Sequence, residues 1–371
     1  MAIVPTITAW DLNTNTLLTN LRAINPSYSV RMNDAGEFSL KLDLTDAMAS
    51  QQAALILAVA ETTPFKVIFA DSPYAIRFSG IAWNVTKSST DPTVTIAGKA
   101  LPSYFTQVVA TKSYNTTINP ATLLYNVVYD TQNQPAANIR ITPRLALNSP
   151  PPNITPSYTD NQRVTAAQII ADCTAAITPG IGGVDYYMTD AFVNGAPTHT
   201  LNIAAPRCGR DQTVSGAFLD LTQAIQWDWA TNAAQAGNQA IVVGSGSGVT
   251  QPTSIKDANF PRGGLGQPPL LQMVYQFNRL STQPELDAQA NGLLQMFGKP
   301  VTVPTITMAA DYPALPLGSF MIGDDIRVYS PPTAWFPQGL SQWWRIVAYT
   351  VTYPDQGLPT YTLTLNRPPV F

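Results

Sequence analysis

A glycine-rich run could in principle bind a nucleotide phosphate. Gly244-Ser245-Gly246-Ser247-Gly248 follows the apolar run Ile241–Val243, as the phosphate loop of a dinucleotide fold follows its first strand. The run lacks the G-x-G-x-x-G spacing, and Gln251-Pro252 interrupts any helix that could come after it. We therefore predict a glycine-rich turn here and no bound cofactor.

Two other groups of polar residues have no spacing typical of a metal or catalytic site. His199 is the only histidine, so a zinc site or a histidine-based triad would need partners that the sequence does not offer. We expect a structural or surface role for this side chain. Asp324 and Asp325 precede a strand-like run without the ligand spacing of a calcium loop, and we interpret them as a solvated turn.

Glu285 and Asp287 are the remaining candidates for acid–base chemistry. They fall in the first turn of a predicted helix, where the helix dipole favours carboxylates. A pair of carboxylates that hydrolyses a glycosidic bond is defined by its separation in space, which the sequence leaves open. A cell-wall hydrolase therefore stays as an alternative, although no catalytic signature supports it.

The composition indicates a surface covered by other subunits. Charged residues make up only 12% of the 371 residues, against about 25% in ordinary soluble domains. With so few charges a large protein has little to keep it monomeric. The net charge of −3 also provides no basic field that would attract nucleic acid or an anionic membrane.

The cysteines and the apolar runs indicate a chain made in the cytoplasm without a membrane span. Cys173 and Cys208 are too few for a disulfide scaffold, and we expect both to be buried. Residues 1–11 lack the basic and apolar segments of a signal peptide. The longest apolar run, Ala53–Ala60, is far too short to cross a bilayer.

The clearest secondary-structure pattern in the sequence lies at 342–366. Two runs rich in Thr, Val and Tyr flank Pro354-Asp355-Gln356-Gly357, where Pro and Gly occupy positions that a turn favours. β-Branched and aromatic side chains suit a half-buried pleated surface. The pattern predicts a β-hairpin.

The same hairpin pattern occurs near the N-terminus. Ala82-Trp83-Asn84-Val85-Thr86 matches Ala348-Tyr349-Thr350-Val351-Thr352 in the form A-[WY]-x-V-T. Pro92–Ile96 then matches Pro359–Leu363 in the form P-T-[VY]-T-[IL], and a strand-like run precedes each hairpin. Two unrelated hairpins can share Thr and Val by chance, but the common order of three elements favours a duplication. We infer one small β-domain used twice.

Further patterns lie before, between and after these hairpins. Strand-like runs occur at 7–11, 17–23, 28–32, 37–44, 65–70, 185–189, 198–204, 241–243, 271–277, 301–309 and 326–329, and helical patterns at 46–60, 165–177, 218–229 and 282–297. The chain is therefore predicted to be mainly β with a few helices, of the α+β class. We predict a β-barrel or sandwich at 1–108, a mixed α/β middle region at 109–270 and a second copy of the first domain at 271–371.

An aromatic segment before the last hairpin is the best candidate for a partner contact. The segment Ser330–Trp344 contains Trp335, Phe336, Trp343 and Trp344. Aromatic side chains are enriched in the buried centres of protein interfaces. The alternative is that these rings close one end of the second β-domain.

Four stretches of the sequence carry a family resemblance. They are RMNDAGEFSLKLDL at Arg31–Leu44, IVVGSGSG at Ile241–Gly248, LGSFMIGDDIRVY at Leu317–Tyr329 and RIVAYTVTYPDQG at Arg345–Gly357. In these stretches the chain resembles the minor tail proteins that form the tail-tip hub of long, non-contractile-tailed bacteriophages. Those proteins are similar in turn to the baseplate hub proteins of contractile-tailed phages.

The resemblance implies a structural role in assembly. In that family each chain carries two similar β-barrel tube domains, and three chains form a pseudo-sixfold ring that continues the tail tube. It implies a homotrimer in the tail tip of the virion, made in the host cytoplasm, with no enzymatic activity and no cofactor. Expected partners are the distal tail protein ring, the tape-measure protein and other minor tail proteins, with non-specific passage of viral DNA. The alternative is a β-rich tail module that binds a receptor or glycan.

Overall fold

In the computed structural model, strands dominate the chain, and the described residues are 5–72, 75–149, 151–175, 183–234, 236–248, 251–258, 268–277 and 280–367. The strands are β1 (Thr6–Asp11), β2 (Leu17–Leu21), β3 (Ala23–Arg31), β4 (Glu37–Asp43), β5 (Phe65–Ser72), β6 (Ala75–Lys87), β7 (Thr93–Ala100), β8 (Ile141–Leu147), β9 (Asp185–Val193), β10 (Ala196–Ala205), β11 (Ala217–Asp220), β12 (Gln226–Asn232), β13 (Gln239–Val243), β14 (Thr253–Asp257), β15 (Gln272–Gln276), β16 (Val301–Ala309), β17 (Asp325–Ser330), β18 (Leu340–Thr352) and β19 (Thr360–Asn366). The helices are α1 (Ala47–Ala60), α2 (Pro120–Gln132), α3 (Ala166–Thr174) and α4 (Gln283–Phe297). The predicted mainly β, α+β class is confirmed.

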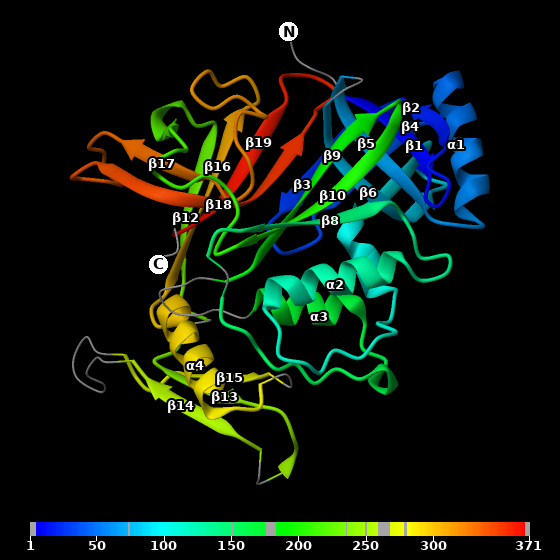
Figure 1. Cartoon of the computed structure of the whole chain (residues 1–371). Helices are drawn as coiled ribbons and strands as arrows, with labels where there is room; N and C mark the ends of the chain where they lie inside the picture. The colour runs from blue at the N-terminus through cyan, green and yellow to red at the C-terminus, as the bar shows by residue number, and fades with distance from the viewer. Residues whose placement is uncertain are drawn as a thin grey trace.

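One large sheet contains strands from both ends of the chain. Within the described residues it has 13 strands, in the order β12-β16-β19-β18-β3-β4-β7-β6-β5-β1-β2, with β17 paired to β18 and β11 paired to β17. The antiparallel pair β3–β18 joins the N-terminal strands, blue in Figure 1, to the C-terminal strands, red and orange. Pairings among the described residues do not close this sheet into a barrel, so the two barrel domains stay a prediction.

Helix α1 packs against the N-terminal part of this sheet. Asp46 caps it, because its side chain accepts hydrogen bonds from the backbone N–H groups of Met48 and Ala49. Ala49, Ala53 and Ile56 are buried in the same core as the sheet. Their small and aliphatic side chains at helical spacing let the helix approach closely. The predicted helix at 46–60 is confirmed.

The middle of the chain folds into a second, smaller layer. Strands β8, β10 and β9 form a three-stranded sheet, and α2 and α3 share one core with it. Figure 1 shows both helices below these strands. The pair β9–β10 was predicted, but α2 and β8 were not. Asn119 caps α2 and Pro120 occupies its first turn, and these are start signals that can be read in the sequence.

The predicted helix at 218–229 is wrong. These residues form β11, a short 3-10 helix at Leu221–Gln223, and most of β12. Trp227 and Trp229 alternate with exposed Asp228, which is a period of two and not of 3.6. Strand β12 pairs with β16 and β11 with β17, so residues assigned to the middle region extend the C-terminal strands.

A third, three-stranded sheet lies at the lower end of the molecule in Figure 1. Its order is β14-β13-β15, and α4 packs on one face of it. Helix α4 has the predicted capping box between Thr282 and Glu285. Leu286, Ala290 and Leu293 are its buried side chains against the sheet. A helix assigned to the C-terminal region therefore packs on strands of the middle region.

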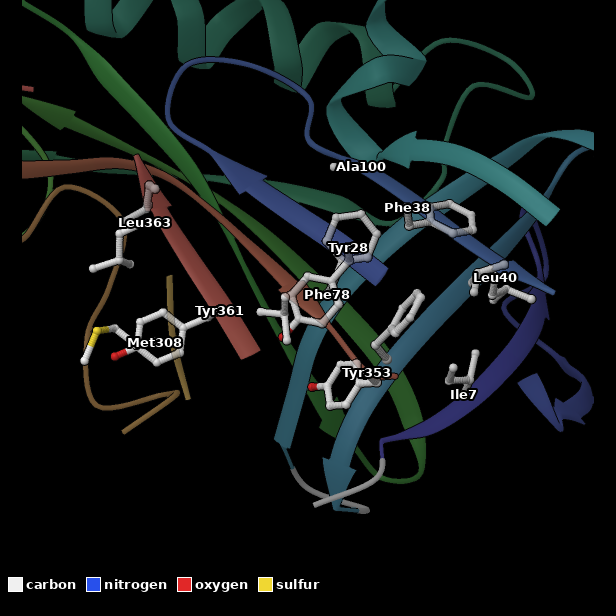
Figure 2. Packing of buried hydrophobic residues seen from close by; sticks show 14 of the residues in the cluster. Ile7, Tyr28, Phe38, Leu40, Phe78, Ala100, Met308, Tyr353, Tyr361 and Leu363 are labelled. Carbon is white, nitrogen blue, oxygen red and sulfur yellow. The ribbon is translucent and has the colours of Figure 1, made fainter. Parts of the chain in front are cut away.

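The largest core lies beneath the 13-stranded sheet. Figure 2 shows Tyr28, Phe38 and Phe78 packed together at its N-terminal end, and Tyr361 near Met308 at its C-terminal end. The Tyr28 and Phe78 rings are stacked with their centroids 5.3 Å apart. Because one continuous core serves both groups of strands, burial of apolar area stabilises them together.

Candidate functional site

The large sheet contains the same arrangement of strands twice. Strands β3, β4, β7, β6 and β5 are neighbours in that order, and each pair is antiparallel. Strands β12, β16, β19, β18 and β17 follow the same order, again with every pair antiparallel. We call these the first and second strand sets. Their common order supports the duplication inferred from the sequence.

The two sets also share their register. Ile96 lies opposite Leu40 in the first set, Leu363 lies opposite Ile306 in the second, and all four side chains are fully buried. Each long strand has a bulge, at residue 83 in β6 and at residue 347 in β18. The bulges and buried pairs therefore give a match residue by residue.

This match corrects the alignment predicted from the sequence. Val85 pairs with Ile96, and Tyr349 pairs with Leu363, so Val85 corresponds to Tyr349. The A-[WY]-x-V-T pattern instead matches Val85 with Val351, two residues further along. A shift of two residues leaves every side chain on the same face of a strand, so a period-two pattern cannot detect it.

The two strand sets meet along one seam. On the side of β18 away from β19, residues 340–345 pair with β17 and residues 348–352 pair with β3. Tyr28 lies opposite Val351 in this seam, with exposed fractions of 1% and 0%. The second half of β18 thus provides an edge on which the next strand set is added.

A buried polar network ties the middle region to β18. Arg345, only 6% exposed, donates to Asp185 of β9 at 2.5 Å, to the Cys208 carbonyl at 2.9 Å and to the Gly323 carbonyl at 3.2 Å. Asp185 also accepts from the Cys208 N–H at 3.0 Å and from Asn33 at 2.9 Å. Charge-assisted hydrogen bonds of this kind stabilise the fold and also fix the relative orientation of the groups that they join.

The predicted solvated turn at Asp324 and Asp325 is wrong, because both side chains belong to this network. They are 0% and 2% exposed. Arg207 binds Asp325 through two nitrogens, at 2.7 and 3.1 Å, and Arg210 is paired with Asp324. The sequence could not reveal this, because the two arginines lie more than a hundred residues away along the chain. These two ion pairs hold residues 207–210 against the start of β17.

Two glycines let the backbones in this network come close together. Gly209 and Gly323 both have positive φ, of 79° and 89°. A Cβ atom on Gly209 would lie 2.0 Å from the Gly323 carbonyl carbon, which is backbone and cannot rotate away. Only glycine fits a left-handed conformation with so little space.

Replacing Gly209 with Ala is expected to destabilise the chain much more than the same change at Gly195. Both have positive φ, but a Cβ on Gly195 meets nothing within 4 Å. Gly195→Ala should cost about 1 kcal/mol for the left-handed conformation alone, and Gly209→Ala should add the backbone clash. Urea-induced unfolding of the two variants measures the difference. Equal losses would show that the loops can separate without cost.

Aromatic side chains from three segments form a cluster beside β12. Trp227 lies 6.2 Å from Trp335 and 5.5 Å from Phe336 between ring centroids. Trp229 lies 5.4 Å from Phe336 and 5.2 Å from Trp344. The edge-to-face angles of most of these pairs are favourable for aromatic rings. Trp227 and Trp229 were not among the predicted contact residues, because the pattern around them was interpreted as a helix.

This cluster is buried at one end and open at the other. Trp344 is 2% exposed, whereas Trp335 is 77% exposed. Beside the rings is a hollow of about 490 Å³, lined by Trp229, Trp335, Phe336, Trp344 and neighbouring residues that include Arg367. Of the four predicted contact residues, Trp343 does not join the cluster, since it lies on the face of β18 opposite to that of Trp344.

No family model and no curated protein sequence matches the chain. Solved structures do match over nearly its whole length. The tail protein from Neisseria meningitidis MC58 has a TM-score of 0.58 at 11% identity, and the alignment covers 98% of this chain and 96% of that one. The 43 kDa tail protein of prophage MuSo2 from Shewanella oneidensis gives 0.58 and 11%, covering 98% of each chain. The prophage tail protein gp18 from Listeria monocytogenes EGD-e gives 0.53 and 11%, covering 98% and 95%.

The chain has the fold of these phage tail proteins. The family resemblance found in the sequence is thereby confirmed at the level of the fold. The agreement extends over both strand sets and the middle region, because the alignments leave out only a few per cent of either chain.

The other candidates for chemistry have structural partners in this tail-protein fold. His199, 1% exposed, lies with its Nδ1 2.8 Å from Asp190, so the predicted structural role fits and a surface role does not. Glu285 closes the capping box of α4, and Asp287 is paired with Lys256 at 3.0 Å. Across the described residues, no three His, Cys, Asp or Glu side chains gather as metal ligands.

The glycine-rich run connects two antiparallel strands of the tail-protein fold. It lies between β13 and β14, and Gly246 and Gly248 have φ of 113° and 71°. The next strand along the chain, β14, pairs with β13, so the run lies in the connection between two strands, as the predicted turn requires. Cys173 and Cys208 are both buried, as predicted. Within the described part of the chain, no helix has the length and apolar character to cross a membrane.

Proposed function

We propose that this chain is a structural protein of a bacteriophage tail tip, a hub that continues the tail tube. Three copies would form a ring, and each copy would contribute its two strand sets as two tube-like domains. The observation that carries this proposal is the repeat of five strands, in one order and one register, within a fold shared with phage tail proteins over its whole length.

The repeat explains how a threefold ring could join a sixfold tube. A chain with two like domains presents six similar units when three copies close around an axis. The seam between β3 and β18 already places two such units side by side within one chain. The low content of charged residues is consistent with a surface that other subunits cover.

The partners follow from this place in the virion. The ring would stack below the distal tail protein and contact the tape-measure protein and other minor tail proteins, with the middle region on its outer side. Viral DNA would pass without specific binding, and the net charge of −3 suits this, because sequence-independent DNA affinity comes from Lys and Arg. The role requires no catalysis and no cofactor.

Mass and copy number test the proposal. Light scattering of the purified chain should give three times the 40.0 kDa of one chain. Quantitative mass spectrometry of purified virions should give three copies per particle, and an antibody should label the tail tip in electron micrographs. Absence from virions, or labelling of the capsid, would exclude the tail-tip role.

Truncation of Trp335 to Ala is expected to weaken binding to a partner subunit by tenfold or more, a typical effect for a central interface tryptophan. Trp335 is 77% exposed, so its own contribution to folding should be small. Sedimentation measures the association, and Val214→Ala, at a side chain 69% exposed, is the control. Phe336 lies between Trp227 and Trp229, so Phe336→Ala should reduce folding stability as well. Unchanged assembly with lower stability in both variants would show that the cluster only closes the second strand set.

A further inference from the structure

The counterparts of the two strands in the seam have strand edges that lack a partner among the described residues. On the side of β6 away from β7, β5 pairs with residues 75–82 only, and the described residues place no strand against 84–87. Strand β12 is likewise an edge, paired with β16 on one side only. Edge strands carry unpaired backbone N–H and C=O groups, which readily accept a further strand.

These two edges are the repeat counterparts of the two strands that form the seam. Since Val85 corresponds to Tyr349, residues 84–88 correspond to 348–352 of β18. On the other strand, Phe38 corresponds to Pro304, and their opposite residues Tyr28 and Trp229 therefore correspond. The edge of β12 is thus the counterpart of the edge of β3.

Residues in the seam are buried, and their counterparts at the two edges are more exposed, as expected for edges without a partner strand. Tyr28 and Ser29 are 1% and 8% exposed where β3 lies against β18. Their counterparts on β12, Trp229 and Ala230, are half-buried and exposed, and Thr86 on β6 is exposed. The edge of β12 therefore presents a half-buried aromatic ring, Trp229, and the edge of β6 an exposed polar side chain, Thr86.

We propose that β12 of one copy adds to the end of β6 in a second copy, in antiparallel register. Transferring the seam pairs Ser29–Thr350 and Tyr28–Val351 puts Ala230 opposite Thr86 and Trp229 opposite Lys87. The Lys87 side chain would then cover the Trp229 ring, a favourable cation–π contact. This proposal rests on the ring of three copies proposed above and specifies which residues of neighbouring copies are in contact.

The geometry is also compatible with a closed ring. Within the described residues each chain has one edge of each kind, β12 in the second strand set and the end of β6 in the first, so the contact is head to tail. A head-to-tail contact repeats from chain to chain and forms a ring when the rotation between copies closes. The open end of the aromatic cluster lies beside β12, because Trp227 contacts Trp335, so the second copy would approach the exposed ring.

Engineered cysteines test the register. Thr86→Cys and Ala230→Cys combined in one chain should give covalently linked multimers on mild oxidation, since directly opposite residues lie within disulfide range. The matched control is Ser29→Cys with Thr350→Cys, which should close within one chain and leave the mass unchanged. A second control combines Thr86→Cys with Gln226→Cys, four residues along β12, or about 13 Å away. The native cysteines are buried and contribute little background.

Each outcome decides a different question. Multimers from the Thr86–Ala230 pair, at least tenfold more abundant than from the Thr86–Gln226 pair, support the proposed pairing. A threefold oligomer in which only the Ser29–Thr350 pair closes overturns the pairing and leaves the tail-tip hub intact. Single chains at all concentrations and in virions overturn both proposals. Far-ultraviolet circular dichroism confirms that each variant is folded.

Discussion

Replacing Arg345 by Met is expected to lower the free energy of unfolding by about 3–5 kcal/mol, the usual cost of removing one partner of a buried ion pair. Arg345 is 6% exposed and gives Asp185 its only ionic partner among the described residues. The variant leaves that carboxylate charged in a site with little access to water. Urea-induced unfolding followed by circular dichroism measures the loss.

Two further variants separate the charge from the loss of packing. Adding Asp185→Asn to Arg345→Met removes the uncompensated charge, so the double variant should recover part of the stability. The exposed pair Lys99–Glu37, separated by 3.8 Å, supplies the control. Lys99→Met should change stability within experimental error, because exposed ion pairs contribute little. A loss at Arg345→Met no larger than at Lys99→Met would show that the network is not important for stability.

The network also distinguishes the two strand sets. By the register match, Ile81 of the first set corresponds to Arg345, and Lys66 corresponds to Asp325. The apolar Ile81 is fully buried in the core that α2 and α3 share, and Lys66 donates to Asn15. Both sets thus use the Ile81 and Arg345 positions to contact the middle region, the first through apolar packing and the second through an ion pair with Asp185, to which Asp325 adds a pair with Arg207. We infer that the duplicated unit diverged where it had to anchor the rest of the chain.

Local patterns were sufficient for the hairpins and for most of the helices. The pair β18–β19 follows from β-branched residues on both sides of a Pro–Gly turn, and the Thr282 capping box marks the start of α4. These signals act between residues close in the sequence, so they survive without tertiary information. The helix predicted at 218–229 failed because the alternation around Trp227 covers only a few residues.

Contacts between distant segments could not be predicted. The burial of Asp324 depends on Arg210, and the aromatic cluster joins Trp229 to Phe336. No spacing rule links such pairs, because their distance along the chain carries no structural period. For the same reason the sequence could not predict that both strand sets belong to one sheet, since the seam between β3 and β18 joins strands more than three hundred residues apart.

Replacing Lys66 by Met is expected to change how stability depends on pH. Lys66 is fully buried on β5, and its ammonium donates to Asn15 at 2.8 Å. Burial, helped by Arg140, lowers the pKa of Lys66 to about 8, while Asp190 and Asp11 oppose the shift. The unfolded chain keeps the ordinary pKa of about 10.4. Between these two pKa values the unfolded state binds more protons than the folded state. The destabilisation that buried Lys66 causes therefore decreases as pH rises.

The penalty is complete below pH 8 and amounts to about 3 kcal/mol for a shift of this size. Stability of the wild type relative to Lys66→Met should therefore rise by about 2 kcal/mol between pH 7 and 9.5. The difference between the two proteins is the measurement, because burial raises the pKa of Cys208 to about 12 and this acts in the opposite direction in both. The exposed Lys99→Met should run parallel to the wild type. A difference that stays constant with pH would show that Lys66 keeps its ordinary pKa, and that water reaches its ammonium in the folded protein.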